Sequence, residues 1–298
     1  MADQALVNLE AREALAVDWI AAASMTCIVY DHFITFGQEY ATVWGSRLSI
    51  PKVLFFLNRY VVEGMLIFNA LASAHRHLSI PVCVFYLRWL VITITVTNAV
   101  VEGILVARVW AVYRQNKLIL IITLGFYFGG IATLTGLTIK DYVGEGVSAV
   151  DDFNVLPGCY ASSVPAIIAG YWIAPVIIES FLFALIVAKS FSWKKDNGQT
   201  PRALTLLARD STIYFLIIFV LLITNLFVFE YGPPFLSSMM VTPSNAAGCI
   251  AGSRMLLNLR GLYEATSTTD YEMTKDIAFT PKRVREPDTI MTIGHHDW

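Results

Sequence analysis

The sequence predicts an all-helical polytopic membrane protein, built as a bundle of seven transmembrane helices. Of its 298 residues, 56% are hydrophobic and only 15% are charged, and the mean hydropathy is +0.60. That composition is too apolar for an ordinary soluble domain of this length. A helix needs roughly 20 mostly apolar residues to cross the hydrocarbon core of a bilayer. Such segments occur approximately at residues 17–37, 51–73, 85–109, 118–139, 164–188, 211–231 and 236–257.

The two ends of the chain differ from this apolar region. The segment 1–16 is short and acidic and lacks the basic region of a removable signal peptide. After residue 260 the chain becomes rich in Thr, Ser, Asp, Lys and Pro, with too few apolar residues to fold alone. We therefore expect a short extracellular segment at 1–16, a membrane domain at 17–260 and a disordered cytosolic tail at 261–298.

The positions of lysine and arginine predict the orientation in the membrane. They gather in the connections 114–117 and 189–209, whereas the connection 140–163 is acidic. Because short cytosolic loops carry the excess of Lys and Arg, the N-terminus should lie outside and the C-terminus in the cytosol. We expect the plasma membrane to hold the protein. The net charge of −2 shows no basic excess, so we expect no nucleic-acid partner. The apolar spans make the lipid bilayer the expected partner.

Among the ionisable residues inside the expected spans, five form a candidate polar network in the first, second, third and fifth spans. An ionisable side chain near the middle of a bilayer costs at least about 2.5 kcal/mol, so each is a candidate site residue. With a rise of about 1.5 Å per residue, the first-, second- and third-span positions fall at similar depths. They form either an interhelical salt bridge, with the arginine facing one of two acids, or a switch or proton relay. The five are Asp31, Arg59, Glu63, Glu102 and Glu179.

The third span also carries a polar stripe. Arg88, Thr95, Asn98 and Glu102 follow one another at spacings of seven, three and four, which places them on one helical face. A polar face across the membrane looks into the bundle rather than at lipid. It either lines a pocket or forms hydrogen bonds with neighbouring helices.

The four cysteines fall into two pairs. Cys27 and Cys249 lie inside spans, where a thiol usually behaves as a small apolar group. Cys83, just before the third span, and Cys159, before the fifth, lie on the oxidising side in the expected topology. They form either a disulfide that ties the third helix to the outer loop or two unpaired thiols.

A pattern in the first two spans resembles a known family. It reads YDH..T...E....W.........LF..NRY from Tyr30 to Tyr60. It is similar to the N-terminal domain of unknown function, here at about residues 19–75, that opens a large group of seven-helix membrane proteins in mushroom-forming fungi. The segments 107–117 (ARVWAVYRQNK) and 157–160 (PGCY) resemble later parts of that group. The resemblance implies a seven-helix integral membrane protein and no particular activity.

The leading functional hypothesis is a receptor-like signalling protein with the topology of G-protein-coupled receptors. Its partners would be an unknown small ligand and a cytosolic signalling protein. Arg108, Tyr113 and Arg114, at the inner end of the third span, are the candidates for cytosolic coupling. The hypothesis is an analogy of topology and not of a site.

The alternative hypothesis is a proton-coupled transporter of small solutes. Its relay carboxylates would be Asp31, Glu63, Glu102 and Glu179, around Arg59. We do not expect an enzyme, a metal or a cofactor. Five histidines, two of them in the tail, are too few for a di-iron centre, and the sequence has no phosphate-binding or nucleophile motif.

Overall fold

The computed structural model describes residues 2–73, 79–143, 170–195, 202–232, 236 and 239–258. The chain divides into two compact units, Met1–Arg260 and Gly261–Trp298, of which the second lies outside the described residues. Within the described ranges the chain is helical and contains no strand. The elements are α1 (Ala2–Glu39), η1 (Tyr40–Trp44), α2 (Ile50–Phe56), η2 (Leu57–Val62), α3 (Glu63–Ser73), α4 (Ile80–Val112), α5 (Lys117–Val143), α6 (Gly170–Lys195) and α7 (Arg202–Tyr231). A further helical segment covers residues 241–258.

Six stretches of the described chain are long and apolar enough to cross a membrane. They coincide with the first six predicted spans. The seventh predicted span, 236–257, is not among them, and the helical segment at 241–258 carries several polar residues within its apolar sequence. The six are Ala11–Trp44, Ile50–Ala72, Pro81–Val112, Lys117–Lys140, Gly170–Ser192 and Thr212–Tyr231.

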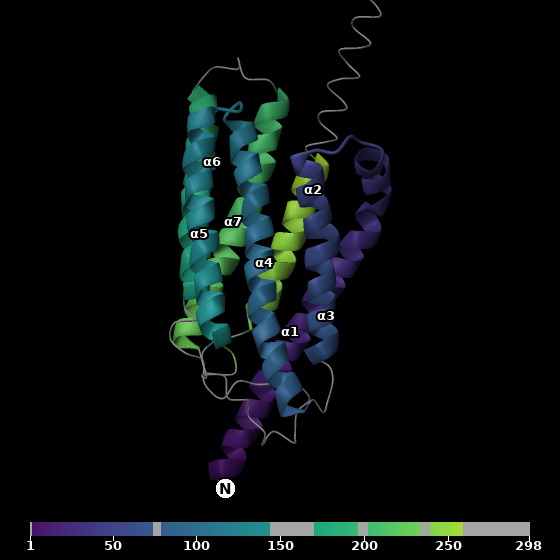
Figure 1. The fold of residues 1–298 in the computed structure, drawn as a ribbon, viewed down its shortest axis with the longest axis vertical. Coiled ribbons are helices and arrows are strands. Elements are labelled where there is room, and N and C mark those ends of the chain that lie inside the picture. The colour runs from purple at the N-terminus through teal and green to yellow at the C-terminus, as the bar shows by residue number, and fades with distance from the viewer. Residues whose placement is uncertain are drawn as a thin grey trace, which may run out of the picture. The chain divides into compact units, whose positions relative to one another are not determined.

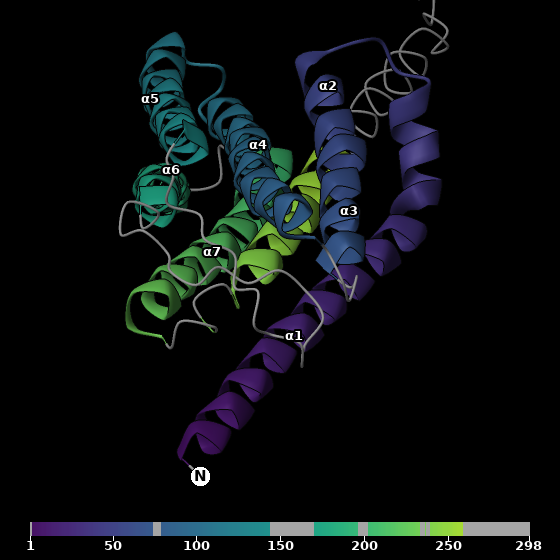
Figure 2. The same ribbon diagram turned by 60° about the horizontal axis from the view of Figure 1, so that its bottom comes forward.

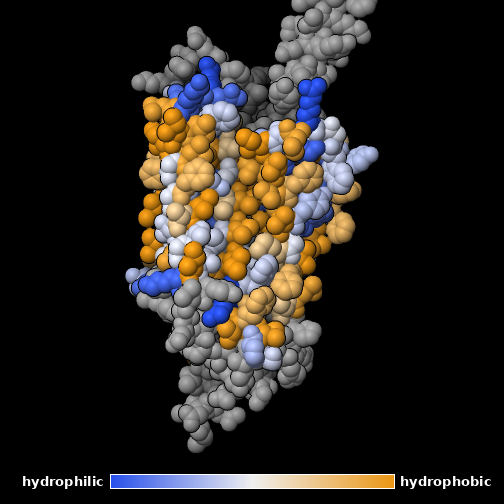
Figure 3. Space-filling view, in the orientation of Figure 1, coloured by the Kyte–Doolittle hydropathy of each residue, from blue (hydrophilic) through white to orange (hydrophobic). Residues whose placement is uncertain are grey.

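The outer surface of these helices is apolar. Large side chains such as Phe33, Ile121 and Phe128 are 75%, 67% and 61% exposed. The space-filling view shows a broad hydrophobic band along the helices, with hydrophilic residues gathered towards its two ends (Figure 3). A surface of this kind is stable in hydrocarbon and not in water.

Helix α4 lies at the centre of the first unit (Figure 1). It contacts α2, η2 and α3 on one side and α5, α6 and α7 on the other. Helix α1 runs along the edge of the group that contains α2 and α3, as the turned view shows (Figure 2). With 38 residues, α1 is about 57 Å long, which exceeds a bilayer core of about 30 Å. The predicted segment 1–16 is therefore largely the first part of this helix.

Two glycines allow the segment 241–258 to approach α4 closely. A Cβ on Gly252 would lie 2.9 Å from Ile104 Cδ1 and 3.2 Å from Asn58 Nδ2, and one on Gly248 would lie 3.1 Å from Val101 Cγ2. Glycines four residues apart lie on the same side of a helix and let two backbones meet. The segment thus packs against the centre of the bundle.

Candidate functional site

Two π-helical turns interrupt the first two spans, one directly after the buried polar residues of the first span and one containing those at 58 and 59 of the second. η1 continues the end of α1, and η2 joins α2 to α3 within the second span. A π turn adds a residue to the helical repeat, and such turns are frequent at functional sites. Asn58 and Arg59 are in η2 and are 0% and 2% exposed.

The guanidinium of Arg59 is enclosed by groups of the first span. Its Nη1 lies 3.2 Å from Asp31 Oδ2, and its Nη2 donates to the His32 carbonyl at 2.9 Å and to Thr35 Oγ1 at 2.6 Å. Its Nε lies 3.3 Å from Glu39 Oε2, an ion pair without the alignment of a hydrogen bond. The buried cation therefore meets two buried carboxylates, those of Asp31 and Glu39.

Three further donors complete the surroundings of these carboxylates. Arg254 Nε donates to Asp31 Oδ1 at 2.6 Å. The Tyr60 hydroxyl and the Trp44 indole both donate to Glu39 Oε1, at 2.5 and 3.0 Å. Asp31, Thr35, Glu39, Trp44, Arg59, Tyr60 and Arg254 are together called the Arg59 cluster.

Glu63 belongs to a separate pair at the edge of the Arg59 cluster. His32 Nδ1 lies 3.0 Å from both carboxylate oxygens of Glu63. The His32 ring stacks on Phe36 and meets Tyr60 edge-on. Two arginines and three carboxylates are thus gathered around His32.

Asn58 connects the second span to the segment 241–258. Its Nδ2 donates to the Cys249 carbonyl at 2.7 Å and to Ser253 Oγ at 2.9 Å. The Cys249 thiol in turn donates to the Asn58 carbonyl at 3.3 Å. Cys249, to which the sequence assigned no role, is therefore a free thiol within a polar interhelical contact.

Glu102 and Glu179 lie apart from Arg59 and line a different site. The contacts of Arg59 are to the first span, so Glu102 is not its partner among the described residues. Glu102, on α4, and Glu179, on α6, instead line one enclosed cavity. Its other polar lining residues are Thr97, Asn98, Trp172, Ser244 and Asn245.

The polar stripe of α4 has both of the roles that the sequence left open: part of it lines a cavity, and part of it forms hydrogen bonds with a neighbouring helix. Asn98 and Glu102 line the cavity. Thr95 Oγ1 lies 2.8 Å from Thr138 Oγ1 of α5, where either hydroxyl can donate. Arg88, nearer the start of α4, is only partly buried. One helical face thus serves both a cavity and a helix contact.

The C-terminal end of α4 is held against α6. The Tyr113 hydroxyl donates to the Leu185 carbonyl at 2.9 Å, and Lys189 Nζ lies 5.3 Å from the Tyr113 ring centre. Burial raises the pKa of the Tyr113 hydroxyl, which keeps it a neutral donor. Arg108 is 2% exposed, while Arg114 is exposed in the turn to α5.

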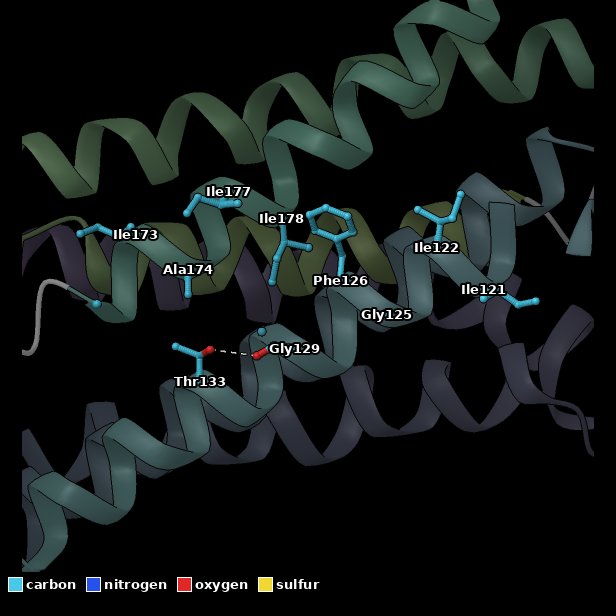
Figure 4. Close-up of a pocket in the computed structure, with 12 residues that line it drawn as sticks. Ile121, Ile122, Gly125, Phe126, Gly129, Thr133, Ile173, Ala174, Ile177 and Ile178 are labelled. Atoms are coloured by element: carbon cyan, nitrogen blue, oxygen red, sulfur yellow. Dashed lines mark hydrogen bonds between the residues drawn. The ribbon is translucent and has the colours of Figure 1, made fainter. Parts of the chain in front are cut away.

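An apolar groove of about 730 Å³ lies between α5 and α6. Ile177, Ile178 and Phe126 from the two helices line it, and its one hydroxyl, that of Thr133, donates to the Gly129 carbonyl at 2.9 Å (Figure 4). This hydroxyl therefore already donates its hydrogen bond within α5. The groove therefore suits hydrocarbon, such as a lipid chain, rather than a polar ligand.

The predicted disulfide is only half within the described residues. Cys83 is buried in the first turns of α4, but Cys159 and the PGCY segment lie outside the described residues. The link between the two stays a prediction.

The fold and the buried polar residues together define an integral membrane protein of the polytopic helical class. Residues 19–62 match a family of unknown function (DUF6533), and this match spans the Arg59 cluster except Arg254. No curated protein matches the chain. The family has no assigned activity, so function is argued from the site.

Proposed function

We propose that this protein is a receptor-like sensor of the plasma membrane with seven spans, an outside N-terminus and a cytosolic C-terminus. The segment 241–258 would complete the seventh span, since it packs on α4 through Gly248 and Gly252. The orientation is supported by the basic turn 114–117 and the basic end of α6. The resemblance to proteins of mushroom-forming fungi supports a fungal source.

One observation supports this proposal most directly. Helices α4 and α6 both line the polar cavity, and the same two helices meet again at their basic ends through the Tyr113 contact. α4 supplies Glu102 and Tyr113, whereas α6 supplies Glu179 and Leu185. Glu102 and Tyr113 are eleven residues apart, about 16 Å along a helix, and Glu179 and Leu185 are about 9 Å apart. A ligand that changes the spacing of α4 and α6 in the cavity would therefore act on the Tyr113 contact.

In this proposal Arg108 is the residue that a cytosolic protein contacts. It is buried in the present arrangement, so a partner reaches it only after the inner ends of α4 and α6 separate. Such a separation of helices is a common switching movement. The Tyr113 hydroxyl bond to Leu185 then stabilises the inactive arrangement.

The test is coupling of the Tyr113→Phe variant to signalling proteins in native membranes. Loss of one hydrogen bond, worth about 1 kcal/mol, should raise the basal population of the active arrangement about fivefold. Tyr231→Phe, at an 80% exposed position, is the matched control. If neither the wild type nor Tyr113→Phe retains a G-protein subunit where a known receptor does, the proposal fails.

A proton-coupled transporter is the second candidate, favoured by two acids deep in the bundle, Glu102 and Glu179. The structure divides the expected relay, because Asp31 is ion-paired with two arginines and Glu63 with His32. A relay would therefore use the cavity acids. Proteoliposomes that show no pH-driven uptake over a broad panel of solutes would exclude this candidate.

A further inference from the structure

The cavity between α4 and α6 contains buried acid groups whose hydrogen-bonding capacity is unused. Glu102 is 4% exposed and Glu179 is 1% exposed. Among the residues that the structure describes, both carboxylate oxygens of Glu102 and Oε1 of Glu179 have no hydrogen-bond partner. Within the described part of the chain, the ion pairs engage Asp31, Glu39 and Glu63 instead.

Neutral polar groups of the same cavity are also unpaired. The hydroxyls of Thr97 and Ser244 and the amide nitrogen of Asn98 are buried and find no hydrogen-bond partner in the described part of the chain. Asn245, which is 7% exposed, lines the cavity beside them. Buried polar groups in proteins are nearly always paired, so a set of unpaired groups around one cavity indicates a missing ligand or water.

We propose that this cavity binds one small monovalent cation, of the size of Na⁺, between Glu102 and Glu179. Two buried carboxylates that share one enclosed cavity are strongly disfavoured from being ionised together without a compensating positive charge. Hydroxyl, amide and carboxylate oxygens are the ligands that hard cations prefer. The lining of the cavity supplies all three kinds.

The size of the cavity restricts the ligand. About 20 Å³ is open to the centre of a water-sized sphere, which is room for on the order of one water molecule. An organic solute does not fit, and neither does Mg²⁺ with the several waters it retains. The described residues also contain no group of three or more His, Cys, Asp or Glu side chains that could hold a metal ion. A single bare cation with one ionised and one protonated glutamate leaves the site neutral.

The inference concerns the cavity used in the proposed function but does not need it, because a cation can stabilise a bundle that does not signal. The experiment therefore reads binding and not signalling. The wild-type protein in detergent is heated in 1–300 mM NaCl, with choline chloride holding the ionic strength constant. At a sodium concentration of about 100 times Kd, the Tm should rise by roughly 5–10 °C and then saturate.

Three variants locate the effect. The Tm of Glu102→Gln and of Glu179→Gln should not depend on sodium. In choline chloride without sodium, each variant should have a higher Tm than the wild type under the same conditions, because one buried acid without a counter-charge has been removed. Glu230→Gln, at an exposed acid near the end of α7, should keep the wild-type response. If a glutamine variant fails to fold, the wild type and Glu230→Gln still show whether sodium stabilises the protein.

Several results would overturn the inference. One is equal Tm values in sodium and choline at every pH, and another is stabilisation by acid alone, which would mean that a proton is the only ligand. A sodium effect that persists in Glu102→Gln and Glu179→Gln would place the ion elsewhere. Stabilisation by micromolar Ca²⁺ that sodium does not reproduce would exclude a monovalent site.

Discussion

Replacement of Arg59 by methionine tests whether the Arg59 cluster holds the first two spans together. The change keeps a long side chain but removes the cation that lies 3.2 Å from Asp31 and 3.3 Å from Glu39. Asp31 keeps Arg254 as a partner at 2.6 Å. Glu39, which is 0% exposed, keeps only the neutral donors of Tyr60 and Trp44. One buried carboxylate is thus left without a counter-charge.

The expected loss of stability follows from that single carboxylate. Removal of one partner of a buried ion pair costs about 3–5 kcal/mol, and for a domain of this size that corresponds to a fall in Tm of roughly 6–20 °C. Arg254→Met is the matched control. Removal of the Arg254 cation leaves Asp31 with Arg59 as a counter-charge at 3.2 Å, so no carboxylate loses its last cation and the loss of stability should be smaller than in Arg59→Met.

Thermal melting in detergent, followed by fluorescence and by retention on size exclusion, measures both variants. The double variant Arg59→Met with Glu39→Gln should recover part of the loss, because the uncompensated carboxylate is then neutral. A stable Arg59→Met protein, within about 0.5 kcal/mol of the wild type yet inactive in signalling or transport, would refute the structural interpretation and indicate a functional charge.

Three other predictions concern packing, the turn and the cysteines. Gly252→Val should lower stability by about 1–3 kcal/mol through overpacking, whereas Gly125→Ala, whose Cβ would meet nothing within 4 Å, should be neutral or stabilising by up to about 1 kcal/mol. Arg114→Gly should stabilise by a few tenths to about 1 kcal/mol, because φ is 53° there, in the position after a helix end that glycine prefers. In unreduced, denatured protein, maleimide should label Cys83 and Cys159 only after reduction.

Each of these has a contrary outcome. Equal melting of Gly252→Val and Gly125→Ala would mean that the segment 241–258 does not pack closely on α4. A destabilised Arg114→Gly protein would show that the arginine side chain contributes more than its backbone conformation costs. Labelling of both cysteines without reduction would exclude the disulfide.

Composition alone predicted the membrane class and the first six spans, because a run of about 20 apolar residues has few other stable environments. The seventh predicted span, 236–257, is not among the apolar stretches that the described residues contain. Asn245, Ser253 and Arg254 lower its hydropathy, and in the structure Arg254 and Ser253 bond to the first and second spans. Two of the residues that make the segment polar, Ser253 and Arg254, are thus ones that attach it to the bundle.

The candidate site was only partly predictable. Depth estimates placed Asp31 and Arg59 together but left Glu102 as an equal alternative for Arg59, because a depth does not say which way a helix face turns. Glu39 lies beyond the first predicted span, at 17–37, and entered only through the family pattern. The π-helical turns η1 and η2 change the repeat of the helix, so a regular periodicity cannot place their side chains.

The bond between Arg254 and Asp31 also bears on the biogenesis of the protein. These residues are 223 positions apart, so at about 5–20 residues per second the ribosome adds Arg254 roughly 11–45 s after Asp31. Throughout that interval Asp31 Oδ1 lacks its final partner, although Arg59 is already present. The pair between Asp31 and Arg254 can therefore form only after the segment 241–258 has been synthesised. Insertion and quality-control factors would meet the chain without this pair in every copy that is synthesised.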